Sequence, residues 1–238
     1  MIPTSDFARA APESPKPVWG SLTAAAIVSG YGLMSILVML AINLVVALAP
    51  EASEALQPLL SAQITPTAFI ASVTSSSLIF ATVALGAAWL GKEPLRSRLR
   101  LHMGRATAGR IIAGCVGVIA LAFALDGILG FVASTLNFSS LKLMSGVVAR
   151  ASGASFAGIL LTGALGAGVA EELFFRGFIQ SRCSLRWGRW VAITITSVSF
   201  GLAHGDILHT PFALVVGLYI GYLAEHFGGI VPGMMAHI

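Results

Sequence analysis

The sequence contains little charge. Only 10% of its 238 residues are Asp, Glu, Lys or Arg, whereas an average soluble domain carries about a quarter of its residues as these four types. This shortage excludes a soluble, disordered or fibrous protein. Cysteine is also scarce: Cys115 lies in an apolar run and Cys183 in a basic loop, so the pair gives no disulfide framework. The cysteines therefore do not indicate a redox compartment.

Apolar residues in long runs dominate the chain instead. Hydrophobic residues make up 56% of the sequence, and several runs exceed the roughly 20 residues that a helix needs to cross a bilayer. These features predict an all-α fold, a polytopic transmembrane helical bundle of six to seven spans. The expected spans are residues 22–49, 67–91, 111–136 and 155–177, followed by the shorter stretches 190–204, 212–224 and 229–238.

The basic residues indicate how these spans are oriented. Of the 14 Lys and Arg residues, all except Lys142 and Arg150 fall on one side of the predicted spans, and the positive-inside rule makes that side cytoplasmic. We therefore expect a cytoplasmic N-terminus, a flexible tail over residues 1–20 and one integral membrane domain over residues 21–238. The first run is too long for a signal peptide, so we expect it to stay in the membrane rather than be cleaved after Ala49.

Two adjacent glutamates near the end of the fourth span are the first candidates for chemistry. In a helix, Glu172 and Arg176 lie four residues apart on one face with the acid N-terminal, the favourable order for an ion pair. Glu171 is rotated by about 100° from its neighbour and has no arginine of its own. In a poorly solvated site such a carboxylate is suited to act as a general base. The alternative is that both glutamates mark the cytoplasmic boundary and are solvated by lipid headgroups.

Two histidines on later apolar stretches lie at a depth similar to that of Glu171. At a rise of about 1.5 Å per residue, Glu171, His204 and His237 lie ~15, ~21 and ~16 Å from the cytoplasmic ends of their segments. Three acid–base groups therefore converge near the middle of a roughly 30 Å hydrocarbon core. Phe200, four residues before His204, is placed to pack beside the imidazole and keep the site apolar. Taken alone, either histidine could instead be hydrogen-bonded across a helix interface.

The other ionisable residues of the apolar region are not expected to take part in catalysis. Asp126, near the middle of the third span, is either a second polar partner in the bundle or, as we favour, a hydrogen-bonding residue at a helix interface. Asp206 and His209 are expected in a short, solvated, non-cytoplasmic connection. His226 is expected near the membrane interface.

Together these residues resemble the CPBP family of intramembrane glutamic endopeptidases, which includes type II CAAX prenyl endopeptidases and Abi-like, bacteriocin-processing proteins. The resemblance lies in three short patterns on successive late helices. The pattern E-E-x-x-x-R is matched by Glu171, Glu172 and Arg176, F-x-x-x-H by Phe200 and His204, and the start of H-x-x-x-N/D by His237.

The resemblance covers residues 155–238, and the first three spans are generic membrane helices. The third pattern requires Asn or Asp four residues after His237, but the sequence ends at Ile238. We therefore expect either that the chain is truncated at its C-terminus or that its last helix is incomplete and the oxyanion site defective.

The resemblance implies a membrane hydrolase that cleaves membrane-anchored or CAAX-type substrates with activated water. Glu171 and His204 would jointly activate the water, and His237 would help to stabilise the oxyanion. Glu172 and Arg176 would orient the helix and the site. No cofactor and no nucleic acid is implied; the expected partners are a membrane-anchored protein or peptide and the lipid bilayer. The expected location is a bacterial inner or plasma membrane.

Three other functions remain open from the sequence. A zinc-dependent membrane protease is the nearest, because glutamate and histidine can bind zinc, but H-E-x-x-H is missing from the sequence. A non-proteolytic immunity or scaffold protein of the same fold would fit the incomplete third pattern. A proton-coupled transporter would use buried acids as relays, but such transporters usually show an internal duplication, and none is evident.

Overall fold

A computed structural model of the chain describes residues 18–48, 65–136 and 146–238, and no strand occurs among these residues. The expected tail, residues 1–20, lies outside them except for its last three residues, and Ala49 and Lys142 also lie outside. The helices are α1 (Trp19–Leu48), α3 (Pro66–Trp89), α4 (Leu95–Arg98), α5 (Ala108–Leu136), α7 (Ala154–Leu160), η1 (Leu161–Ala167), α8 (Gly168–Glu171), η2 (Glu172–Gln180), α9 (Ser181–Trp187), α10 (Arg189–Ala203), α11 (His209–Phe227) and α12 (Val231–His237).

Four helical segments are long and apolar enough to cross a membrane, which confirms the predicted all-helical membrane fold. They are Trp19–Val38, Pro66–Trp89, Ala108–Val132 and Ala154–Trp187.

The last three apolar stretches form α10, α11 and α12, and none of these helices meets both the length and the hydropathy of a spanning helix. Helix α10 has 15 residues and α12 only seven. The structure therefore supports four spans, and six to seven remains a prediction.

The fourth span is continuous but changes its winding. Two stretches, η1 and η2, are wound as π-helix, on either side of the short α-helical turn α8. π-Helical turns are rare and are frequent at functional sites. Here the second stretch begins at Glu172, so the unusual winding coincides with the paired glutamates.

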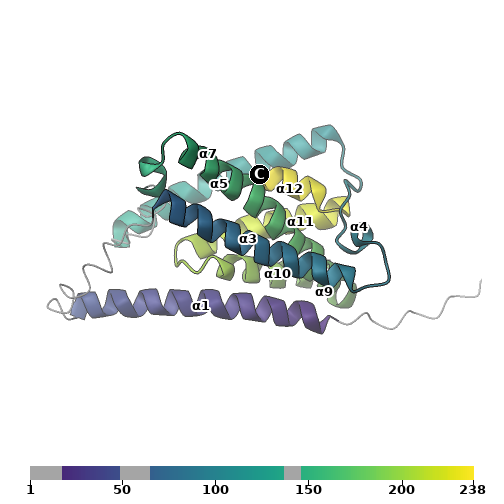
Figure 1. Ribbon diagram of the computed structural model, residues 1–238, viewed down its shortest axis with the longest axis horizontal. Coiled ribbons are helices and arrows are strands. Elements are labelled where there is room, and N and C mark those ends of the chain that lie inside the picture. The colour runs from purple at the N-terminus through teal and green to yellow at the C-terminus, as the bar shows by residue number, and fades with distance from the viewer. Residues whose placement is uncertain (1–17, 49–64, 137–145) are drawn as a thin grey trace, which may run out of the picture.

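The helices are arranged so that the late, shorter ones lie inside the earlier ones. Figure 1 shows α1 along one edge of the bundle and α5 at the opposite edge. Helix α1 packs on α10, α10 on α11, and α5 on both α11 and α12. Helix α3 packs along the fourth span. The candidate residues of α8, η2, α10 and α12 are therefore enclosed by the generic helices.

An aromatic cluster joins three of these elements. The Phe80 ring of α3 stacks on Phe174 of η2 at 4.7 Å between centroids, and Phe175 meets Phe200 of α10 edge to face at 5.2 Å. All but Phe80 are buried almost completely. Such pairs contribute about 0.5–1.5 kcal/mol each beyond their burial, so they help to fix the fourth span against α3 and α10.

Helix α1 makes a very close approach to the C-terminal end of α10. A Cβ atom added at Gly32 would overlap the carbonyl oxygen of Leu202. Across the same contact, a Cβ at Gly205 would lie 2.9 Å from Cβ of Ser35. Because the obstacle at Leu202 is backbone, no side-chain rotation can relieve it. The contact therefore holds the segment that carries His204 against the middle of α1.

This contact predicts different effects for two alanine substitutions in the same helix. Gly32→Ala should destabilise the protein by about 1–3 kcal/mol, because overpacking forces the backbones apart. Gly30→Ala is the matched control, since no atom lies within 4 Å of its added Cβ. Thermal unfolding in detergent should show a lower Tm for Gly32→Ala only; equal Tm values would show that α1 does not pack here.

Candidate active site

The site is built on an ion pair within one turn of η2. Nη1 of Arg176 lies 2.9 Å from Oε1 of Glu172, and both side chains are completely buried. The pair predicted from the four-residue spacing is thus confirmed. The alternative in which headgroups solvate both glutamates does not hold for Glu172, because its carboxylate has no exposed surface.

Arg176 also joins η2 to two neighbouring helices. Its Nη2 donates a hydrogen bond to the carbonyl oxygen of Gly217 in α11 at 3.2 Å, and its guanidinium carbon lies 4.5 Å from the centroid of the Phe200 ring in α10. A Cβ at Gly217 would lie 3.0 Å from that ring and 3.4 Å from Nη2, so a glycine leaves room for both. The guanidinium is therefore held by a carboxylate, a carbonyl and an aromatic face.

His237 of α12 lies between the two glutamates. Its Nδ1 is 3.0 Å from Oε1 of Glu172, and its Nε2 is 3.7 Å from Oε2 of Glu171. The first distance is a hydrogen bond, while the second leaves a gap of the kind that a water molecule often bridges. Glu171 and His237 each keep about a fifth of their side-chain surface exposed, 17% and 20%. Glu171 is therefore the accessible glutamate and Glu172 the enclosed one.

His204 lies at the end of α10 and is oriented by Phe200. Its Nδ1 is 2.8 Å from the carbonyl oxygen of Phe200, and the two rings meet edge to face at 5.0 Å. Because a carbonyl can only accept, Nδ1 donates and Nε2 remains the basic nitrogen. The Phe200 ring also lies 5.7 Å from that of His237. This confirms the packing predicted for Phe200 and places one ring against His204, His237 and Arg176.

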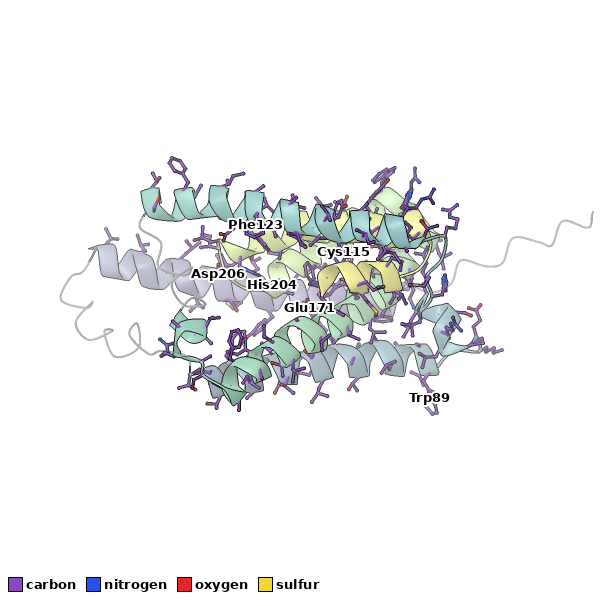
Figure 2. All side chains as sticks on the ribbon, turned by 90° about the horizontal axis from the view of Figure 1, so that it is seen from above. Trp89, Cys115, Phe123, Glu171, His204 and Asp206 are labelled. Carbon is purple, nitrogen blue, oxygen red and sulfur yellow. The ribbon has the colours of Figure 1, made fainter. Side chains whose placement is uncertain are left out.

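The glutamates and histidines lie well inside the bundle. Figure 2 shows Glu171, His204 and Asp206 in the middle of the molecule, far from Trp89 at the end predicted to be cytoplasmic.

A second polar cluster holds α12 in place from that predicted cytoplasmic end. Arg100 binds Glu225 of α11 through Nη1 and Oε1 at 2.8 Å. Gln180, the last residue of η2, donates to the same Glu225 oxygen at 3.1 Å. The carbonyl oxygen of Arg100 accepts from the amide of Ile230, at 2.9 Å, just before α12 begins. The loop after α4 thus ties the start of α12 to the end of η2, and so positions His237 relative to the glutamates.

The environments of His209, Asp206 and Asp126 differ from those expected from the sequence. His209, expected in a solvated connection, is exposed but lies with its ring 4.7 Å from that of His204. Asp206 accepts hydrogen bonds from the amides of Leu208 and His209, so it supports the site. Asp126 is exposed on α5, and no side chain of the described segments forms the interface hydrogen bond expected for it. The short separation of His204 and His209, five residues, is the only sequence feature that could have indicated the contact between their rings.

The arrangement can activate and orient a nucleophilic water. It offers an accessible carboxylate, a neutral imidazole nitrogen on a second helix and an imidazole on a third. Within residues 18–48, 65–136 and 146–238, no group of three or more His, Cys, Asp or Glu side chains could hold a metal ion. That no cofactor is used remains a prediction.

The buried pair leads to a stability prediction. Arg176→Met should lower the free energy of unfolding by about 3–5 kcal/mol, because it leaves the Glu172 carboxylate buried without its partner. Arg186→Met, at an exposed position of α9, is the control and should change stability by less than about 0.5 kcal/mol. Unfolding in mixed micelles would measure both; a stable Arg176→Met protein would contradict the role given to the pair.

One family of known proteins matches the C-terminal part of the chain. Residues 153–238 match the family described as type II CAAX prenyl endopeptidase Rce1-like. No curated protein and no solved structure matches the chain. The matched segment contains the glutamate pair, Arg176, Phe200 and both histidines of the site, in agreement with the resemblance seen in the sequence. Residues 153–238 are thus similar to the Rce1-like type II CAAX prenyl endopeptidases, a family of membrane proteases.

Proposed function

We propose that the protein is an intramembrane endopeptidase in which Glu171 activates the water that attacks the peptide bond. The observation that carries this proposal is the division between the two adjacent glutamates. Glu172 is neutralised by Arg176 and enclosed, whereas Glu171 is partly accessible and faces a histidine across a gap of 3.7 Å. A carboxylate without an arginine partner in an apolar site is the one suited to accept a proton.

The reaction needs only groups that the chain supplies. Glu171 takes a proton from water as the water oxygen forms a bond to the carbonyl carbon, and Nε2 of His204 helps to orient and polarise that water. His237, whose Nδ1 proton is held by Glu172, donates from Nε2 to the oxygen on which negative charge develops when its ring carries a second proton. The C–N bond then breaks, and the proton held by Glu171 passes to the leaving nitrogen. The second proton of the water, left on the new carboxylic acid, passes to Nε2 of His204 as that acid becomes a carboxylate. No serine or cysteine nucleophile and no covalent intermediate are required.

Supporting residues keep this geometry fixed. Arg176 and Phe200 link η2 to α10, and Glu172 holds Nδ1 of His237. Their contribution is to keep the reacting groups within a few tenths of an ångström of the productive arrangement. Glu172 is therefore a positioning residue, although it stands next to the base in the sequence.

An apolar cavity next to the glutamate helix supports a membrane-anchored or CAAX-type substrate. It has a volume of about 530 Å³ and lies between α3 and the first half of the fourth span. Ala170 and Leu173, which flank the glutamates, belong to its lining. Pockets of this volume accommodate drug-sized apolar groups, so a hydrocarbon anchor placed here would bring its attached peptide close to Glu171.

The direct test compares protein termini in membranes from cells that express wild type, Glu171→Gln or His204→Ala. New termini should appear with wild type and disappear with both variants, because each removes a group that activates water. Asp126→Asn and His226→Ala are the controls, since both positions are exposed and lie outside the site. Asp206 is unsuitable as a control because it caps the helix that begins at His209.

Quantitative mass spectrometry of the termini decides between the candidate functions. Loss of wild-type termini with Glu171→Gln but not with the controls supports proteolysis. Identical termini in all samples, with any immunity phenotype retained, would favour a scaffold protein instead.

A further inference from the structure

A third histidine lies beside the proposed catalytic histidine. His209 is the first residue of α11, and the centroid of its ring is 4.7 Å from that of His204, with 44° between the ring planes. It lies outside the three family patterns. Its side chain is exposed, so one part of the ring contacts the site and another part is open.

The connection that carries His209 is tightly built. Oδ1 of Asp206 accepts from the amides of Leu208 at 2.9 Å and of His209 at 2.7 Å. The His209 ring also stacks on Phe212, one helical turn further on, at 5.4 Å. Gly205 adopts a positive φ of 61°, a conformation that costs glycine little. These contacts fix the position of an imidazole that a solvated loop would leave free.

The connection also lies deep in the protein. Helix α10 has 15 residues and therefore rises only about 22 Å, less than the roughly 30 Å of a hydrocarbon core. Helix α1, which packs on Gly205 through Ser35, continues to Leu48, ~20 Å beyond that contact. Ionisable side chains at such depth are costly and are by default functional candidates. Asp206 and His209 place two ionisable side chains at this level, and the His209 side chain is exposed on one side.

His204 has only one ring nitrogen that can exchange a proton, and His209 lies beside it. Nδ1 of His204 is committed to the carbonyl oxygen of Phe200, so only Nε2 can exchange a proton. Glu171, on the other side of the reaction, passes its proton to the leaving group. The proton that Nε2 of His204 takes from the new carboxylic acid must therefore leave by another route before the next turnover.

We propose that His209 is a positioning residue for His204, holding its ring and exchanging its proton with water at the open side of α11. This proposal rests on the proposed function. In the exchange, a bridging water carries the His204 proton to one nitrogen of His209 as the other nitrogen releases a proton to water. One N–H bond forms as another breaks, and the ring ends uncharged.

The charged and titratable neighbours of the two rings are few. Asp206 faces His209 from the connection. His204 is faced by His209, by His237 from α12 and by Arg176 from η2. Helix α1 contacts the connection through Gly32 and Ser35, which are uncharged. A change in the pH profile on substitution of His209 is therefore attributable to the His204–His209 pair.

The test measures kcat and KM for wild type, His209→Ala, His209→Phe and His226→Ala in phosphatidylcholine vesicles. The probe is an internally quenched, farnesylated CAAX peptide, assayed from about pH 5 to about pH 9 with and without free imidazole. His209→Phe keeps an aromatic ring against His204 and guards against loss of folding. His226→Ala is the matched control, because His226 is exposed at the far end of α11.

We expect kcat to fall about tenfold or more in both His209 variants, with KM changed by less than about twofold. The acid limb of the pH profile should change, and free imidazole should restore activity to His209→Ala but not to His209→Phe. Wild-type kcat and pH profile in His209→Phe would overturn the proposal, as would the failure of imidazole to restore His209→Ala.

Glu171→Gln in the same assay separates this proposal from the proposed function. In one outcome, wild type and His209→Phe cleave the probe at the same rate and Glu171→Gln does not cleave it. Only the His209 proposal then fails. If wild type does not cleave the probe, or Glu171→Gln cleaves it as fast as wild type, the proposed function fails and the His209 proposal fails with it.

Discussion

The buried ion pair between Glu172 and Arg176 is the interaction on which the rest of the site depends. Two charges removed from water are tolerated only when they neutralise each other and fill their remaining hydrogen-bonding positions. Here α10, α11 and α12 supply part of those contacts, through Phe200, Gly217 and His237, while Oε2 of Glu172 and Nε of Arg176 are buried without a hydrogen-bond partner. The contacts of one buried pair therefore join η2 to three other helices.

The same constraint separates two adjacent, chemically identical side chains. Glu172 is held at 2.9 Å from Arg176 and is completely buried, while Glu171 keeps 17% of its side-chain surface exposed. Neighbours on a helix point about 100° apart, so neutralising one leaves the other free to face the site. One helical turn thus supplies both a buried anion and the accessible carboxylate that we propose to be the base.

Local patterns in the sequence predict much of this arrangement. The long apolar runs predict α1, α3, α5 and the fourth span, and the four-residue spacings predict the Glu172–Arg176 pair and the packing of Phe200 on His204. These contacts fall within one helical turn, where spacing alone determines the face. The π-helical winding of η2 is not evident, because it keeps the same residues on a continuous helix.

Contacts between distant segments cannot be predicted in this way. Arg100 and Glu225 are 125 residues apart, and nothing in either local pattern indicates the other. His209 reaches His204 because Gly205 turns the chain and Asp206 accepts from the amide of His209, where α11 begins. Gly32 resembles any other glycine of an apolar helix until its contact with Leu202 is known. Helix α1 and the loop after α4 lie outside residues 153–238, yet both position residues of the site.

The most direct measurement compares Glu171→Gln with Glu172→Gln for stability and hydrolysis in the same vesicles. If the buried pair fixes the site and Glu171 is the base, Glu171→Gln should keep the wild-type Tm and lose detectable hydrolysis of the farnesylated CAAX peptide. Glu172→Gln should lower the Tm. Hydrolysis by Glu171→Gln at the wild-type rate, or an unchanged Tm for Glu172→Gln, would contradict this division between the two glutamates.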